Sequence, residues 1–305
     1  MEQQSQLTAA LKELTRITGI ELQLSIHSPE EEEQALTQIR CLISAYKEKY
    51  NKTQFLLSLM TDSAPSYDVN ERASRLHIAP DECRVLYLLH VPRGVDDTVT
   101  AVLKHLFPSQ TKTYLVPVTD SLLVILKPLH PEECEEDVLH FAQELVDMLN
   151  MEALISVQIS YSNIFHHLTE LAPAFQGAGL ALKVGRLFSA GETIFAYNKL
   201  GIGRLIYRLP KDLCIQFLSE VFGEDIPETL DSDLMTVIDR FLQNNLNIAE
   251  TARQLHMHRN TLIYRLEQIE KRTNLDLRHF EDAMTFKIAV MVLNYLHSER
   301  TSNYE

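Results

Sequence analysis

The chain has few cysteines and no long apolar segment. Its 305 residues include four cysteines with no C-x-x-C pair among them: Cys41, Cys83, Cys134 and Cys214. This spacing argues against a disulfide framework and against a zinc knuckle, so we interpret all four as buried or idle thiols. No apolar run approaches the ~20 residues that span a bilayer, and the N-terminus lacks the basic and apolar regions of a signal peptide. We therefore expect a cytoplasmic protein with no membrane partner.

Positive charge is also scarce. The 28 Lys and Arg residues face 42 Asp and Glu residues, which gives a net charge of −14 and argues against a protein whose whole surface contacts nucleic acid. Residues 245–280 differ, because six basic and four acidic side chains give them +2 and leave −16 for the rest. One DNA-facing element on an acidic chain would produce this pattern. A solvated helix of mixed charge remains the alternative.

The length predicts two or three domains in a multidomain α+β protein. With 45% apolar and 23% charged residues, the composition is that of a globular chain. Residues 1–78 combine helical patterns with one extended run at 20–26, and an acidic helix starts after Ser28 as N-cap. We expect a small α/β N-terminal domain here that serves as an input or sensor domain.

Residues 79–200 alternate between β-rich and helical patterns. Two apolar runs joined at Thr119 and Asp120 predict an antiparallel hairpin, so this middle domain should be a sheet covered by helices and not simply doubly wound. The other expected elements are strands at 84–91, 154–162 and 193–197 and helices at 95–107, 131–149 and 164–187. Residues 197–210 indicate a loop or hinge into a wholly helical third domain, residues 201–305.

Within the third domain, residues 247–270 have the pattern of two short helices around a turn. Asn247 is a suitable N-cap, and the first helix has one small apolar face made by Ile248, Ala252 and Leu255. His256 and Met257 form the turn. Apolar residues four and seven apart then bury one face of the second helix: Leu262, Leu266 and Ile269.

The free face of that second helix carries side chains that hydrogen-bond base edges and phosphates in the major groove. They are Arg259, Asn260, Thr261, Tyr264 and Arg265. We add four flanking residues to the predicted DNA-binding set: Arg253, His258, Lys271 and Arg272. Helix pairs of this kind also occur in proteins that never contact DNA, so spacing alone leaves both interpretations open.

The stretch "ARQLHMHRNTLIYRLEQIEKRTNLDL" resembles the C-terminal helix-turn-helix of the purine-catabolism and sugar-diacid regulators, the PucR/CdaR family. Upstream, "ERASRLHIAPDECRVLYLLHV" and "GAGLALKVGRLFSAGETIFAYNKLGIGRLIYRL" resemble the borders of that family's middle domain, a degenerate relative of the GGDEF nucleotide-cyclase fold. The resemblance covers roughly residues 70–300. It implies a bacterial transcription regulator whose recognition helix carries the five free-face residues, with Ala252 and Leu255 on the supporting helix.

The chain departs from the family pattern at two places. His256 stands where such units often have a glycine with positive φ, a conformation that histidine tolerates better than most residues. Residues 1–78 replace the longer sensor of the sugar-diacid regulators, so the family does not identify the effector. The hairpin "PVTDSLLVILKP" has no glycine-glycine-acid-acid signature, so we expect no cyclase, no enzyme and no cofactor.

Other patterns favour structural roles. The histidines at 166–167 and at 256 and 258 lack companions at ligand spacing, so we expect no metal site, and "GAGLALKVG" favours close helix packing over a phosphate loop.

We expect a DNA-binding homodimer or higher oligomer that reads an inverted-repeat operator and responds to a small-molecule effector. Its contacts would come from the middle domain or from the last helix, "AMTFKIAVMVLNYL", unless that helix is central to its own domain. The rival function is a nucleotide-binding signalling protein or enzyme that uses its C-terminal helices for assembly.

Overall fold

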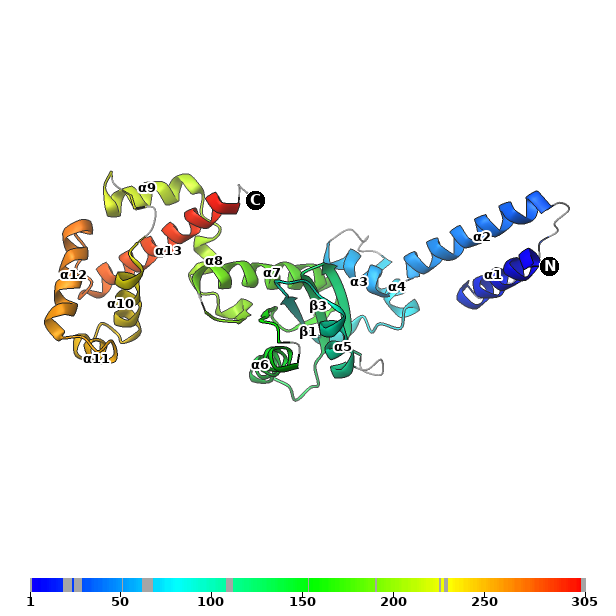
Figure 1. The fold of residues 1–305 in the computed structure, drawn as a ribbon, viewed down its shortest axis with the longest axis horizontal. Coiled ribbons are helices and arrows are strands. Elements are labelled where there is room, and N and C mark those ends of the chain that lie inside the picture. The colour runs from blue at the N-terminus through cyan, green and yellow to red at the C-terminus, as the bar shows by residue number, and fades with distance from the viewer. Residues whose placement is uncertain are drawn as a thin grey trace. The chain divides into compact units, whose positions relative to one another are not determined.

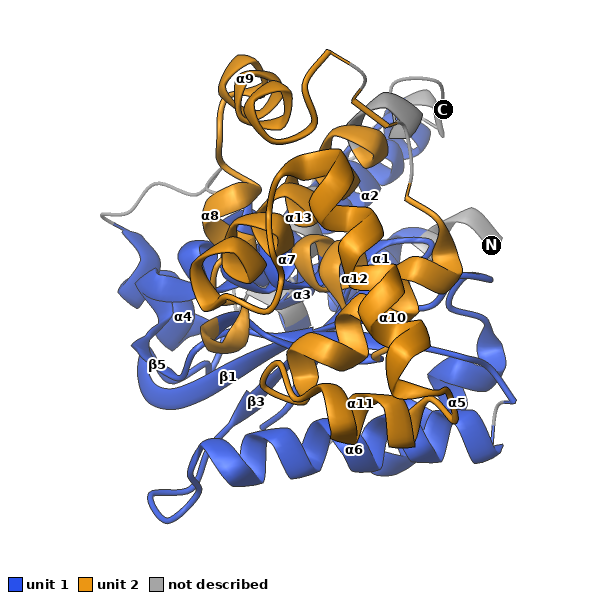
Figure 2. Cartoon of the chain, turned by 90° about the vertical axis from the view of Figure 1, so that its left-hand side faces the viewer, with its two compact units in different colours: residues 1–182, 193–197 blue, residues 183–192, 198–305 orange. Residues whose placement is uncertain are grey.

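The computed structural model describes residues 2–18, 24, 29–50, 52–61, 68–107, 112–152, 154–189, 191–224, 226–227 and 230–302 (Figure 1). Internal contacts divide the chain into two compact units (Figure 2). Unit 1 comprises residues 1–182 and 193–197, and unit 2 comprises residues 183–192 and 198–305. The three domains expected at 1–78, 79–200 and 201–305 stay a prediction.

The described secondary-structure elements before Asp81 are all helices. They are α1 (Glu2–Thr18), α2 (Pro29–Tyr50), α3 (Lys52–Met60) and α4 (Val69–Arg75). The first two helices pair through a small core of buried apolar side chains that includes Leu7, Leu14 and Ile39. Apart from Leu24, the expected extended run at 20–26 lies outside the described residues, as does the expected N-cap Ser28.

The rest of unit 1 is organised around a six-stranded sheet. Its strands are β1 (Asp81–His90), β2 (Tyr114–Thr119), β3 (Leu122–Pro128), β4 (Gln158–Tyr161), β5 (Phe165–His167) and β6 (Ile194–Ala196). The spatial order is β2-β3-β1-β4-β6, and β5 pairs with β1. β2 and β3 form the predicted antiparallel hairpin, and only β4 and β6 pair in parallel. The sheet is therefore not doubly wound, in agreement with the prediction from the sequence.

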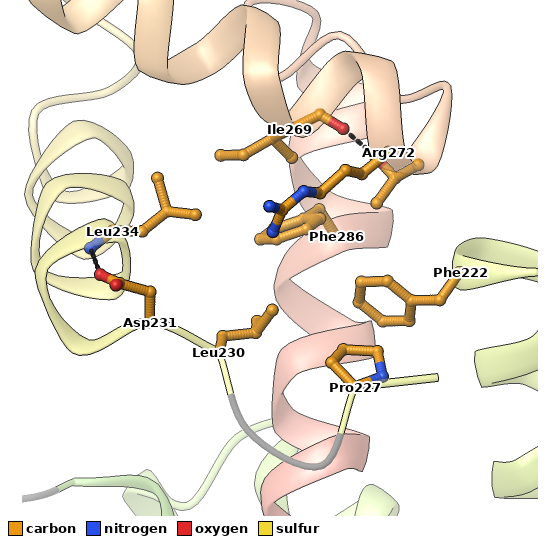
Figure 3. A pocket seen from close by; sticks show the side chains of 9 residues that line it. Phe222, Pro227, Leu230, Asp231, Leu234, Ile269, Arg272 and Phe286 are labelled. Carbon is orange, nitrogen blue, oxygen red and sulfur yellow. Dashed lines mark hydrogen bonds between the residues drawn. The ribbon is translucent and has the colours of Figure 1, made fainter. Parts of the chain in front are cut away.

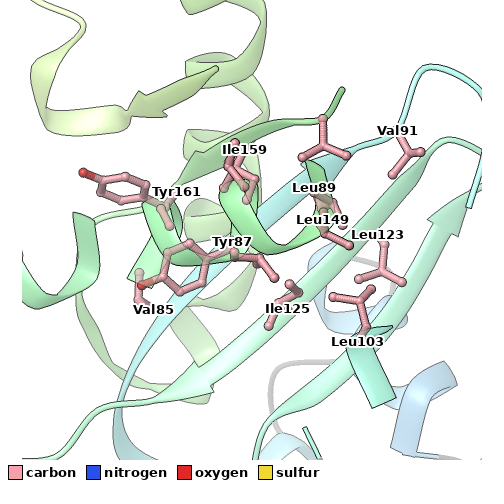
Figure 4. Packing of buried hydrophobic residues seen from close by; sticks show 14 of the residues in the cluster. Val85, Tyr87, Leu89, Val91, Leu103, Leu123, Ile125, Leu149, Ile159 and Tyr161 are labelled. Carbon is pink, nitrogen blue, oxygen red and sulfur yellow. The ribbon is translucent and has the colours of Figure 1, made fainter. Parts of the chain in front are cut away.

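Helices cover both faces of this sheet, which explains why β1 is apolar throughout its centre. Val85, Tyr87 and Leu89 contact a core shared with α5 (Asp97–Leu106) and α6 (Glu135–Glu152) (Figure 4). On the opposite face, the Ser160 hydroxyl donates a 2.7 Å hydrogen bond to the Ala178 carbonyl of α7 (Leu171–Phe188). The predicted helix-covered sheet is confirmed.

Two elements differ from the sequence prediction. The helix expected from residue 164 begins at Leu171, because residues 165–167 pair with β1 as strand β5 and a 3-10 turn, η2 (Leu168–Glu170), follows. His166 and His167 consequently lie on a strand and not on a helix. The expected loop or hinge at 197–210 contains a second 3-10 turn, η3 (Tyr197–Lys199), and α8 (Gly203–Ile206). The added Cβ of any other residue at Gly203 would lie 2.8 Å from the Phe188 ring, so close packing explains this glycine.

Unit 2 is helical beyond residue 210, as predicted. It contains α9 (Lys211–Phe222), α10 (Ser232–Gln243), α11 (Ile248–Gln254), α12 (Arg259–Thr273) and α13 (Phe280–Ser302). Residues of α10, α11, α12 and α13 share one core that includes Phe241 and Phe286. A second core joins α8 and α9 to α13 and includes Leu218 and Leu293. α13 is therefore central to its own unit, which accounts for its apolar sequence without a second copy of the chain.

The described residues contain no membrane span and no metal cluster. None of their helices is long and apolar enough to span a bilayer. No three His, Cys, Asp or Glu side chains in that part of the chain gather as a potential metal site.

Candidate nucleic-acid interface

α11 and the turn after it have the geometry that the sequence predicted. Asn247 is the N-cap, and its side-chain oxygen accepts a 3.1 Å hydrogen bond from the Glu250 amide. Ala252 is 5% exposed in the core shared with α12, so its small side chain allows the two helices to cross closely. His256 has φ +52°, which confirms the positive φ expected at this position. The Met257 amide then donates to the Ala252 carbonyl at 3.0 Å and closes the turn.

His258 determines where α12 begins. It has an extended backbone and is the N-cap, and its Nδ1 accepts a 3.3 Å hydrogen bond from the Asn260 amide. Its carbonyl accepts from the Thr261 amide at 2.9 Å. Capping satisfies amides that the first turn of a helix leaves without partners. The imidazole therefore positions the start of α12, a role that the sequence prediction did not assign to it.

One face of α12 is buried along its whole length. Leu262, Leu266 and Ile269 are each at most 3% exposed, as predicted, and Thr273 continues the same face. They pack against Phe241 and Phe286, among other side chains of this core. The helix ends at Asn274, whose φ of +57° is a left-handed C-cap. With both ends capped and one face buried, α12 can hold its other face in a fixed position.

The opposite face of α12 is polar and exposed. At 3.6 residues per turn, Asn260, Tyr264, Gln268 and Lys271 follow one stripe, and all four are exposed, Tyr264 by 57%. Gln268 was absent from the sequence prediction, although its amide is of the type that reads adenine. Its spacing of four residues from Tyr264 was the signal that could have identified it.

Arg259 and Thr261 lie at the N-terminal end of α12, one residue before and one after Asn260, and so on either side of the stripe. Both are exposed, and Arg259 has no ion-pair or hydrogen-bond partner among the described residues. Of the nine predicted residues, Asn260, Tyr264 and Lys271 therefore follow the exposed stripe, and Arg259 and Thr261 are exposed at the N-terminal end of the same helix.

Arg265 and Arg272 lie on a flank of α12. Both line a hollow beside Asp231 and Asp233 at the start of α10, and Arg265 is half-buried there. Their side chains are seven residues apart, so they share one side of the helix that differs from the stripe through Tyr264. The predicted cluster is therefore divided between a front face and a flank.

Arg253 lies on α11 and is already paired. Its guanidinium contacts both carboxylate oxygens of Glu250, the shortest distance being 2.7 Å. This hydrogen bonding holds the pKa of Glu250 below its ordinary value and raises the pKa of Arg253. Both groups are exposed, so solvent screens the pair. The pair presents less net positive charge than a free arginine would.

Two family models match the chain. The model of the PucR C-terminal helix-turn-helix domain matches residues 234–292, which include the surface described above. The model of the GGDEF-like domain matches residues 61–184. Both matches agree with the resemblance identified in the sequence.

Curated relatives support the same grouping. The chain is 28% identical to the purine catabolism regulatory protein of Bacillus subtilis (strain 168), over 52% of this chain and 30% of that protein. It is 21% identical to the proline-responsive transcriptional activator PutR of the same organism, over 81% of this chain and 63% of that protein. The carbohydrate diacid regulator of Escherichia coli (strain K12) is 22% identical, over 85% of this chain and 70% of that protein.

These alignments leave part of each relative unmatched. The chain spans 30% of the first relative and 63% of the second, so it corresponds to less than two thirds of either protein. The two domain matches nevertheless occur in the order that the sequence predicted, with the GGDEF-like domain before the helix-turn-helix. The chain therefore carries a GGDEF-like domain followed by a PucR C-terminal helix-turn-helix domain, and it is similar to transcriptional regulators of the PucR/CdaR type.

Proposed function

We propose that the chain is a DNA-binding transcriptional regulator whose helix α12 enters the major groove. The observation that carries this proposal is the division of α12 into a fully buried face and an exposed polar face. The exposed face presents Asn260, Tyr264 and Gln268 along one line of a helix that is capped at both ends. Amide and hydroxyl groups arranged in this way suit hydrogen bonding to base edges.

The nine predicted residues take different roles in this proposal. Arg259, Asn260, Thr261 and Tyr264 face the bases, and Gln268 joins them. Four basic side chains contact the phosphates beside the groove: Arg253, Arg265, Lys271 and Arg272. His258 acts through the start of α12, because its side chain is used as the N-cap. Phosphate contacts position a helix, whereas base contacts carry the sequence preference.

A homodimer fits the small size of this reading surface. One recognition helix contacts only a few base pairs, so two copies that reach successive major grooves ~34–36 Å apart would read an inverted repeat. The buried faces of α13 are occupied within unit 2, which favours the middle domain as the source of the dimer contacts. Light scattering that finds a monomer, together with protection of a single asymmetric half-site, would refute the dimer.

The residues ahead of the helix-turn-helix domain receive a small-molecule signal in this proposal. The relative PutR is a proline-responsive transcriptional activator, which supports control of this chain by a small metabolite. A controlling ligand must bind the DNA-competent and DNA-incompetent states with different affinity, and operator must then shift ligand affinity by the same factor. Ligands found by thermal shift that leave operator affinity unchanged would contradict the sensor role.

The proposal includes no catalytic role, because the named relatives are regulators. It places the chain in the cytoplasm, where bacterial DNA lies.

The direct test is to capture genomic DNA with the full chain, sequence it, and measure gel-shift affinity on the enriched site. We expect one enriched sequence class, and we expect Asn260→Ala to lower affinity for it while wild-type affinity for unrelated DNA is retained. Asn294→Ala, on the exposed side of α13, is the matched control and should bind as wild type. Absence of any enriched sequence, or equal binding by the Asn260 variant, would refute the assignment of α12.

A further inference from the structure

A hollow lies inside the helix-turn-helix unit, behind the DNA-facing surface. It has a volume of about 410 Å³ and is lined by side chains from the end of α9 and from α10, α12 and α13 (Figure 3). This volume falls in the range of small-molecule sites, which are mostly apolar with a few polar groups. Wall residues of α12 are Ile269, Arg272 and Thr273, so a molecule in the hollow would contact the helix that presents Tyr264.

The walls are mainly aromatic and aliphatic. The rings of Phe222 and Phe286 meet edge to face with centroids 6.2 Å apart, and Leu234 and Ile269 complete this apolar part. Figure 3 shows these side chains converging on one space. A ring or a branched alkyl chain in that space would be removed from water on several sides.

One basic and one acidic side chain line the hollow, Arg272 and Asp231. Arg272 extends from α12 toward Leu234 and Asp231 (Figure 3), and its guanidinium forms no ion pair among the described residues. Asp231 is already engaged as the N-cap of α10, because its Oδ1 accepts a 2.9 Å hydrogen bond from the Leu234 amide. A guanidinium binds a carboxylate through two parallel hydrogen bonds.

A second hollow of about 270 Å³ adjoins the first and shares Asp231, Leu234 and Arg272 with it. It adds Arg265 and Gln268 to the polar side, together with the carboxylate of Asp233. An anionic group on Arg272 would therefore have a second guanidinium and an amide donor nearby, while its apolar body occupied the larger hollow.

We propose that this hollow binds a small apolar carboxylate, with its ring or branched chain among Phe222, Leu234 and Phe286 and its carboxylate on Arg272. The inference is tested without DNA, so its failure can be distinguished from a failure of the proposed DNA binding, although Arg272 is assigned to both. Arg272 then serves the ligand site, and its assigned phosphate contact is available only when the hollow is empty.

The test uses the full chain and calorimetric titration with three probes, 3-phenylpropionate, 4-methylpentanoate and benzoate, each compared with its neutral amide. We expect at least one acid to bind about tenfold or more tightly than its amide, because the amide cannot pair with the guanidinium. Arg272→Ala should weaken binding of that acid by a similar factor and leave the affinity for its amide unchanged. Lys287→Ala, which removes one exposed positive charge from α13, should bind the acid as wild type.

A second variant tests the location. Leu234→Trp should fill the apolar part and abolish acid binding, and circular dichroism should show that the variant remains folded. The proposal is overturned if no probe acid binds at millimolar concentration, if acid and amide bind equally, or if folded Arg272→Ala binds the acid as wild type. If the Leu234 variant does not fold, the Arg272 comparison decides the question alone, since that side chain is exposed.

Discussion

Helices α12 and α13 lie in the same core but use their apolar residues differently. α12 has 15 residues and buries a single face, whereas α13 has 23 residues and contributes to two cores. Phe286 and Val290 of α13 face the core shared with α12, while Val292 and Leu293 face the core of α8 and α9. An excess of apolar residues in a helix therefore indicates an interface with another chain only where the neighbouring helices of its own unit leave those residues uncovered. The polar face of α12 is the surface that the fold leaves available.

The buried face of α12 gives the largest expected effect. Leu262→Asp would place a carboxylate at a position that is 0% exposed, without a charged or hydrogen-bonding partner in this core. We expect the free energy of unfolding to fall by more than ~4 kcal/mol and the α10–α13 region to unfold. A substitution that buries an unpaired charge is among the most destabilising. Thermal unfolding followed by circular dichroism measures it. Gln268→Asp, on the exposed face of α12, should leave the transition nearly in place, and equal loss by both variants would remove the distinction between the faces.

α13 offers a matched pair of phenylalanines. Phe286 is 2% exposed and contacts Phe222, whereas Phe280 at the start of the helix is 64% exposed. Phe286→Ala should lower the free energy of unfolding by ~3–5 kcal/mol, since it leaves a cavity in the core. Phe280→Ala should change it by only ~0.5 kcal/mol. Urea unfolding of the two variants tests this, and similar losses would show that α13 is not buried as described.

The free face of α12 should affect DNA affinity and not stability. Arg259→Ala should cost ~1–3 kcal/mol on the operator and relax the preference at one base pair. Its melting temperature should match wild type, because Arg259 is exposed and has no partner among the described residues. Lys287→Ala removes the same charge from α13 and should retain operator affinity. Titrations on operator and on random DNA measure the difference, which would disappear if Arg259 contributed only general charge.

Substitutions at His256 test whether the backbone conformation of the turn before α12 stabilises the helix-turn-helix region. His256 holds φ +52°, and a β-branched residue is strained there. His256→Val should therefore lower the free energy of unfolding by ~1–2 kcal/mol. His256→Gly should be neutral or slightly stabilising, because glycine adopts this conformation freely. Chemical denaturation of both variants distinguishes them, and a stable valine variant would show that the turn has another conformation in solution.

The smallest expected effect concerns the His167–Asp81 pair of unit 1, which lies far in the sequence from α12 and α13. The hydrogen bond to Asp81, 2.8 Å from Nδ1, raises the pKa of His167 from its ordinary value of 6.5. Because the pKa is higher in the folded state, the protonated imidazole stabilises the fold. This contribution is fully present below pH 6.5 and is lost as the pH rises through the folded-state pKa. His167→Gln should remove that pH dependence and leave operator affinity unchanged. Urea midpoints measured from about pH 5 to 8 decide it, since an unchanged profile would show that the exposed pair contributes nothing.

Much of the fold could be predicted because local patterns agreed with the final packing. The spacing of Leu262, Leu266 and Ile269 identified the buried face of α12, and the run from 84 to 91 identified the central strand. β5 was missed because it has only three residues, too few to produce a two-residue alternation. Its pairing depends on tertiary contacts that a local pattern does not contain.

The candidate site was predicted in composition but not in arrangement. Residue types identified Arg259, Asn260 and Tyr264, yet the same reasoning grouped Arg265 with them and omitted Gln268. Whether a side chain faces outward or toward α10 depends on where α10 packs against α12, which the residues of α12 alone do not determine. The capping role of His258 was missed for a different reason, because histidine is an uncommon N-cap.

Selection of binding sites from random DNA, with wild type and Arg259→Ala in parallel, tests the central claim about α12 most directly. The account predicts that the wild-type chain enriches an inverted repeat whose half-sites lie about one helical turn apart. The variant should enrich the same repeat with one position in each half-site relaxed. Enrichment of no sequence by wild type, or of an identical pattern by both proteins, would contradict the assignment of α12 as the DNA-reading helix.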